Sequence, residues 1–134
     1  EYVSTRGLSE NIHFLGAMGQ SNYLPLLQES NVFIQHSVLT PSGDSEGTPV
    51  AILEASACGL AICSTRHAGI PDAVKEGKTG LLVEEHDVEG MASALKDLAR
   101  DLEKTRLMGT AAREHMESLY DVVKLSAKIK GLLV

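Results

Sequence analysis

One short apolar segment, residues 49–58, constrains the fold more than any other part of the chain. Thr48 is a good helix N-cap residue, and Pro49 then falls at the first helical position, where proline is favoured. Gly59 follows the segment, as a glycine at a helix C-terminus does. Because the residues between them are apolar almost all round, the sequence predicts a short, buried helix over 49–58.

Short apolar runs on both sides of this helix predict strands. We expect strands at 11–16, 31–35, 60–64 and 81–84, the second of them fully buried, with a helix at 23–29 and one helical turn at 72–76. Strands that alternate with helices indicate an α/β, Rossmann-like parallel sheet with helices on both faces. Ligands of such sheets bind beyond the carboxyl ends of the strands, where the loops after Gln35, Ser64 and Val83 would meet.

The C-terminal part of the chain has the hydrophobic period of helices instead. Apolar residues recur at helical spacing over 88–102, with Asp87 as the cap, and again over 106–119; Asp121 would cap a third helix over 122–133. The 134 residues fit one domain, 1–134, that ends in helices from about 87 to 134. The abrupt start without Met indicates a fragment of a longer chain.

The composition argues against several classes of protein. The formal net charge is -6 and only 4% of the residues are aromatic, which disfavours binding of nucleic acid. No apolar run approaches the length of a membrane span. The five histidines lack metal-ligand spacing, so we expect no metal site. Cys58 and Cys63 lie in apolar surroundings, which predicts inert thiols in a reducing, cytoplasmic compartment.

Two glutamates eight positions apart, Glu46 and Glu54, lie on either side of the predicted helix start. Helical side chains lean toward the N-terminus, so Glu54 would lean over Val50 and Ala51 toward the end where Glu46 lies. That end carries roughly half a positive charge, and its free amides suit an anion such as a diphosphate. Carboxylates accept hydrogen bonds from sugar and ribose hydroxyls. The alternative is that Glu54 is a rim residue paired with a nearby Lys or Arg.

The segment 46–87 resembles the donor-binding half of the retaining glycosyltransferases of family 4, the large group with the GT-B fold. In that group, two glutamates eight apart are followed by segments of the form EAMACG-PV, GG-PE and DG-TGLLV. The matching residues here are Glu46 and Glu54, EASACG at 54–59, GIPD at 69–72 and EGKTGLLV at 76–83. The stretch 32–37 is similar to the strand and PS turn of the family.

The resemblance implies a role for each matching position. Glu46 would be the catalytic residue, near the reacting centre of the donor sugar, and Glu54 would accept hydrogen bonds from the nucleotide ribose. The implied donor-binding set is Glu46, Gly47, Thr48, Pro49, Val50, Ala51 and Glu54, with Ser37, Thr65, Arg66 and His67 as candidate minor contacts. The resemblance implies no cofactor and no metal, because helix amides and basic side chains do what a metal does elsewhere.

The resemblance also implies the activity of the longer protein. It would transfer a sugar, of the hexosyl type, from a nucleotide-diphosphate sugar to an acceptor with retention, in polysaccharide biosynthesis, in the cytoplasm or at the inner face of the membrane as a peripheral protein. The N-terminal acceptor domain of the family and its upstream Arg and Lys, which neutralise the diphosphate, are absent from this sequence. We therefore expect the isolated chain to be inactive.

Three positions depart from the family pattern. Thr48 replaces the usual aromatic residue, Ala68 stands where the first glycine of the GG pair is common, and His36 stands where proline is common. These departures leave the identity of the sugar open, but not the fold. Two other functions also stay open at this point: a GT-B-fold epimerase or phosphorylase, and a Rossmann-like module without catalysis.

Overall fold

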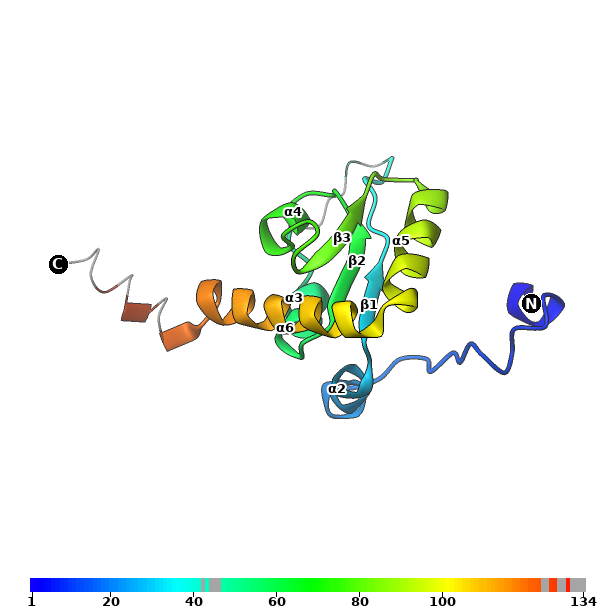
Figure 1. Cartoon of the computed structure of the whole chain (residues 1–134), viewed down its shortest axis with the longest axis horizontal. Helices are drawn as coiled ribbons and strands as arrows, with labels where there is room; N and C mark the ends of the chain where they lie inside the picture. The colour runs from blue at the N-terminus through cyan, green and yellow to red at the C-terminus, as the bar shows by residue number, and fades with distance from the viewer. Residues whose placement is uncertain (42, 44–46, 124–125, 128–129, 131–134) are drawn as a thin grey trace.

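Figure 1 shows the computed structural model of the chain, which describes residues 1–41, 43, 47–123, 126–127 and 130. Helices and strands alternate through most of these residues. In chain order they are α1 (Tyr2–Thr5), α2 (Gln20–Glu29), β1 (Val32–Gln35), α3 (Val50–Ala57), β2 (Ala61–Thr65), α4 (Ile70–Ala73), β3 (Gly80–Val83), α5 (Val88–Arg100) and α6 (Leu102–Leu119).

The three strands form one parallel sheet with β2 in the middle. Val32 of β1 lies opposite Ala61 of β2, and Ile62 of β2 lies opposite Gly80 of β3. Helices pack on both faces of this sheet, α3 and α4 on one and α5 on the other. The expected α/β fold, with a parallel sheet covered on both sides, is therefore confirmed.

Two hydrophobic cores lie on the two faces of the sheet. Successive side chains of a strand point to opposite faces, so Ile62 packs against α3 and α4 while Cys63 packs against α5. Helix α6 joins both cores, because Met116 belongs to the first and Met108 to the second. In Figure 1 this helix runs across the ends at which the strands begin. Loops form the opposite edge, where the strands end.

The buried thiol of the second core is chemically quiet. Burial raises the pKa of Cys63 to about 11, with a smaller contribution from the charge of Glu76. Its Sγ donates to the sulfur of Met91 at 3.2 Å. Because the thiolate is the reactive form, a thiol with this pKa is unreactive at neutral pH. The prediction of an inert thiol is confirmed for Cys63; Cys58 is half-buried and forms no disulfide.

A close approach of two glycines fixes α6 against the turn between α3 and β2. Gly59 ends α3 with a φ of 84°, and its amide donates to the carbonyl of Ser56 at 2.9 Å. This confirms the predicted C-terminal glycine. A Cβ placed on Gly109 of α6 would meet the backbone oxygen of Gly59 at 2.0 Å. Only a residue without a side chain fits at that point of α6.

The predicted helix at 49–58 is present, but its start was wrong in one respect. Pro49 is the N-cap residue, in an extended conformation, and no side chain among the described residues caps the helix. The Thr48 hydroxyl instead donates to the carbonyl of Gly69 at 3.2 Å. The Thr48 hydroxyl therefore binds the loop that follows β2 and does not cap the helix.

The expectation that this helix is buried is confirmed for one side only. Ile52, Ala55 and Ser56 are buried, while Val50 is 67% exposed. A helix that lies on one face of a sheet buries only the stripe of side chains that faces the strands. The outer side of α3 is consequently open near its N-terminus.

Near the N-terminus one predicted strand is absent, and the predicted burial of another strand was wrong. Residues 11–16 form no strand, and Phe14 is 83% exposed. In Figure 1 the chain before α2 runs away from the sheet, and a strand needs a neighbour for its backbone groups. Within the described residues β1 pairs with β2 alone, so it is an edge strand; its Ile34 is 48% exposed rather than fully buried.

The C-terminal helices match the predicted periodicity, but α6 begins at Leu102, which was predicted to belong to the preceding helix. Asp87 caps α5 by accepting from the Gly90 amide at 2.8 Å, and Asp101 caps α6 by accepting from the Lys104 amide at 3.0 Å. The predicted third helix, 122–133, includes residues outside the described ranges. The predicted turn at 72–76 begins earlier, as α4. In the described part of the chain, no helix combines the length and the hydrophobicity needed to cross a membrane.

We expect Gly109→Ala to destabilise the fold. Alanine favours a helix over glycine by about 1 kcal/mol, but the clash of a Cβ with Gly59 costs about 1–3 kcal/mol, so overpacking wins. Urea unfolding followed by circular dichroism measures the difference. Thr110→Ala, at the next and exposed position of α6, is the matched control and should stay within about 0.5 kcal/mol of the parent. An unchanged midpoint for Gly109→Ala would contradict the close contact.

Candidate functional site

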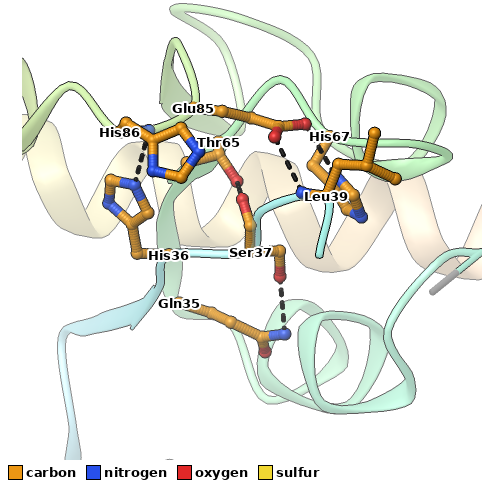
Figure 2. Close-up of polar contacts among 8 residues, drawn as sticks. All are labelled: Gln35, His36, Ser37, Leu39, Thr65, His67, Glu85 and His86. Atoms are coloured by element: carbon orange, nitrogen blue, oxygen red, sulfur yellow. Dashed lines mark hydrogen bonds and ion pairs between the residues drawn. The ribbon is translucent and has the colours of Figure 1, made fainter. Parts of the chain in front are cut away.

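The loops that follow the three strands meet at the carboxyl edge of the sheet (Figure 2). Parallel pairing puts the ends of β1, β2 and β3 on the same side, as expected from the sequence. The contacts there join residues far apart in the chain, including Ser37, Thr65 and His67 from the predicted set.

Glu85 is the residue at which all three loops come together. Its Oε2 accepts from the backbone amide of Leu39 at 2.8 Å, and its Oε1 lies 2.7 Å from His67 Nδ1. A carboxylate only accepts, so the proton of this bond belongs to Nδ1. The Leu39 amide and, second, the hydrogen bond from His67 lower the pKa of Glu85 below its ordinary value of 4.5, against the opposing effect of burial. Reasoning from the sequence missed this residue.

Hydroxyl and amide groups fix the loop that leaves β1. The buried Thr65 hydroxyl donates to the carbonyl of Ser37 at 2.6 Å, and Gln35 Nε2 donates to the Ser37 hydroxyl at 3.0 Å. In the residue before Ser37, the ring Nε2 of His36 accepts a hydrogen bond from the backbone amide of His86 at 3.1 Å. His86 has a φ of 65°. Ser37 and Thr65 are thus brought together by contacts with each other and with the sheet.

The segment before α3 is tied to the loop after β2. Besides the bond from the Thr48 hydroxyl, the Gly69 amide donates to the carbonyl of Gly47 at 3.3 Å. A Cβ on Gly69 would meet the Thr48 hydroxyl. The neighbouring Ala68 has a φ of 45°, a conformation that glycine adopts more easily. This explains in physical terms why glycine is common at this position in the related motif.

The N-terminus of α3 presents backbone amides without partners inside the helix. The first intrahelical bonds are those from Ile52 and Leu53 to the Pro49 carbonyl, at 3.0 and 3.4 Å. The amides of Val50 and Ala51 precede them and lie at the exposed start of the helix. Such an end attracts anions. Glu46, the predicted catalytic residue, lies outside the described residues.

Glu54 is held by two residues of α2. Tyr23 donates its hydroxyl to Oε2 at 2.8 Å, and Gln20 Nε2 donates to Oε1 at 3.1 Å. This bond from Tyr23 is the main reason why the pKa of the phenol is raised. The recorded partners of Glu54 are therefore a phenol and an amide, not the Lys or Arg of the alternative interpretation.

The side chain of Glu54 also lines a cavity. The cavity has a volume of about 460 Å³ and lies between α3 and the second half of α6. Leu53, Ala57 and Met116 form its apolar part, and Glu54 and Arg113 are among its charged residues. No local pattern pointed to Gln20 or Tyr23, because they contact Glu54 across more than 30 positions of sequence.

Arg66 is engaged with acidic side chains. Its Nη2 lies 3.0 Å from Glu76 Oε2 and its Nε lies 3.2 Å from Glu84 Oε1. The Arg66 side chain is 43% exposed, so these pairs contribute little to stability, but they offset its charge. Among the residues that the structure describes, no group of three or more His, Cys, Asp or Glu side chains could hold a metal ion.

We expect Thr65→Val to lower the free energy of unfolding by about 1–3 kcal/mol, because it leaves the Ser37 carbonyl without its buried donor. Thr110→Val removes an exposed hydroxyl that bonds only the preceding turn of α6, and it should cost less. Urea unfolding compares the two variants. Equal losses of unfolding free energy in the two variants would contradict a stabilising role of the Thr65 hydroxyl at this edge of the sheet.

The chain is similar in sequence to known glycosyltransferases. The sequence profile described as "Glycosyl transferases group 1" matches residues 1–115. WcaL of Salmonella typhimurium, named as a glycosyltransferase of colanic acid biosynthesis, is 36% identical over 109 residues, which are 81% of this chain and 27% of WcaL. The GDP-mannose-dependent monoacylated alpha-(1-6)-phosphatidylinositol monomannoside mannosyltransferase of Corynebacterium glutamicum is 29% identical over 127 residues, 94% of this chain and 33% of that protein.

Solved structures share the fold. Anabaena Alr3699/HepE in complex with UDP superimposes with a TM-score of 0.82 at 21% identity, over 98% of this chain and 34% of that one. The same protein with UDP-glucose gives a TM-score of 0.79. The fold is accordingly that of GT-B glycosyltransferases. The chain spans about a quarter to a third of the length of the curated relatives named here. It belongs to the glycosyl transferases group 1 family.

Proposed function

We propose that this chain is the donor-binding part of a retaining glycosyltransferase of family 4. The protein that contains it would transfer a sugar from a nucleotide-diphosphate sugar to an acceptor, with retention of the anomeric configuration. The observation that carries the proposal is the pairing, on the single helix α3, of an N-terminus whose first amides have no partner inside the helix with the Glu54 carboxylate, which α2 holds in place.

The amide terminus suits the diphosphate. Val50 and Ala51 offer backbone donors at the positive end of a helix, a site type that binds phosphate without a metal. The proposal therefore includes no metal and no cofactor. The upstream cations that the family uses would come from the rest of a longer protein.

The carboxylate of Glu54 suits the ribose. An ionised carboxylate has about four acceptor positions, two on each oxygen. Tyr23 and Gln20 take one position on each oxygen, so one remains on each for a further donor. Two neighbouring ribose hydroxyls are a fitting pair of donors. Tyr23 and Gln20 would hold Glu54 in the orientation that receives them.

The sugar end of the donor is assigned by the resemblance alone. Glu46 would act near the reacting carbon, with Gly47, Thr48 and Pro49 as its neighbours along the donor. The names of the similar proteins support a nucleotide-diphosphate donor, because HepE binds UDP and UDP-glucose and the Corynebacterium enzyme depends on GDP-mannose. They differ in the base, so the proposal names the class of donor only.

The names of the relatives also bear on the acceptor. WcaL is named for the biosynthesis of a polysaccharide, and the Corynebacterium enzyme for a phosphatidylinositol mannoside. We therefore propose that the whole protein acts in polysaccharide or glycolipid synthesis. Its proposed location, in the cytoplasm or at the inner face of the membrane, comes from the resemblance alone. An N-terminal domain would bind the acceptor.

In the whole protein, Glu54→Gln and Glu46→Gln should have different effects. Loss of a hydrogen bond to a charged group costs about 1.5–3 kcal/mol, so Glu54→Gln should weaken binding of UDP or GDP about 10- to 100-fold. Glu46→Gln should lower kcat by at least about tenfold and change nucleotide affinity less than about threefold. Calorimetry gives the affinities and initial rates give kcat. The exposed Glu103→Gln, in the first turn of α6, is the control for loss of one charge.

Three results would count against the proposal. No binding of UDP, GDP or their sugars by the whole protein would favour a module without catalysis. Equal losses of unfolding free energy in both variants would make the two glutamates structural. Sugar transfer by residues 1–134 alone would contradict the expectation that the isolated chain is inactive, and NMR of the product anomer tests retention.

A further inference from the structure

We propose that Glu85 is a positioning residue for the donor site. It fixes the loop after β1 through the Leu39 amide and the loop after β2 through His67. The inference rests on the proposed function, and it adds a residue that the family motifs above do not contain.

The loop after β1 is fastened in two places close to the sheet. Thr65, the last residue of β2, bonds the Ser37 carbonyl, and Glu85, two residues after β3, bonds the Leu39 amide (Figure 2). The chain thus leaves the sheet in a direction set by the ends of both other strands. Glu46 follows Leu39 by seven positions in the sequence.

The loop after β2 carries the same constraint to the start of α3. His67 of this loop is bound by Glu85, and Gly69, two residues on, bonds Gly47 and Thr48. One loop therefore connects the Glu85 carboxylate with the residues that directly precede the amide terminus of α3. A change at Glu85 reaches the proposed donor site through His67 and Gly69, and it also releases the loop after β1 at Leu39.

Burial makes the contact with His67 costly to lose, while the contact with Leu39 lies at the surface. His67 is 3% exposed, and the side chain of Glu85 is 28% exposed. Hydrogen bonds that involve an ionised group in such a setting are stronger than neutral ones. Replacement of Glu85 by alanine would leave two donors, the Leu39 amide and the His67 ring N–H, without their acceptor.

Glutamine at position 85 would accept from only one of the two donors, unless His67 changes. Its amide oxygen can accept from the Leu39 amide, but its NH₂ group would then face the N–H of His67, donor against donor. The imidazole must then move or change tautomer. Glu85→Gln and Glu85→Ala therefore separate the contribution of His67 from that of Leu39. Glu89→Gln and Glu89→Ala, at an exposed position in the first turn of α5, are the matched controls.

The proposal predicts a pH signature at Leu39. The titratable groups that face Glu85 are His67 and His86, with His36 behind His86. Since the pKa of Glu85 is lowered in the folded protein, its contacts are complete above the ordinary value of 4.5 and are lost as the pH falls through the lowered value. The Leu39 amide resonance should follow this titration in the parent and should lose it in Glu85→Gln.

The main experiment compares these variants in the whole protein, by amide hydrogen exchange, by binding of UDP and GDP, and by kcat and KM with a UDP- or GDP-sugar. In Glu85→Ala we expect exchange at Leu39 to be at least about tenfold faster, with the β2 amides of Ile62 and Cys63 unchanged. We expect kcat to fall at least about tenfold while nucleotide affinity changes less than about threefold. Glu89→Ala should match the parent in all three.

Two outcomes would overturn the inference. In the first, Glu85→Ala matches Glu89→Ala in Leu39 exchange and in kcat. In the second, exchange accelerates equally at Leu39 and throughout β2, which is the mark of a purely structural residue. If the parent protein binds neither UDP nor GDP, the proposed function fails instead. The exchange and titration at Leu39 would then still decide whether Glu85 holds the two loops.

Discussion

The burial of β2 between two parallel strands is the constraint on which the other elements depend. All five of its residues are buried, and it pairs with β1 on one side and β3 on the other. Its two faces meet different helices, and its first residues lie beside Gly109 of α6. Because α6 covers the end where β2 begins, the end marked by Thr65 is where loops from the whole sheet can meet.

Two carboxylates of the candidate site are held in place by different kinds of donor. Glu85 is bound by a backbone amide and an imidazole, which fasten loops to each other. Glu54 is bound by a phenol and a side-chain amide, neutral groups that fix its direction and leave acceptor positions open. The first arrangement suits a scaffold and the second suits recognition of a ligand hydroxyl. Arg66, by contrast, already has two acidic partners.

The sequence predicted the features that depend on local patterns. Helical periodicity and the Asp87 cap located α5, Gly59 located the end of α3, and the apolar runs located the three strands. It failed where distant contacts decide. The run 11–16 has a strand pattern but no neighbouring strand, and the Thr48 hydroxyl bonds Gly69 rather than the amides of α3. Glu85 binds Leu39 and Tyr23 binds Glu54, each across more than 30 positions of sequence. No spacing pattern in the sequence could therefore reveal these roles.

The start of α3 is the proposed binding site for the diphosphate of a nucleotide. The most direct test follows the backbone amide resonances of Val50 and Ala51 in the whole protein during titration with UDP and with GDP. We expect these two amides to shift together, at the same ligand concentration, with one of the two nucleotides. Shifts elsewhere in the chain without shifts at Val50 and Ala51 would contradict this assignment.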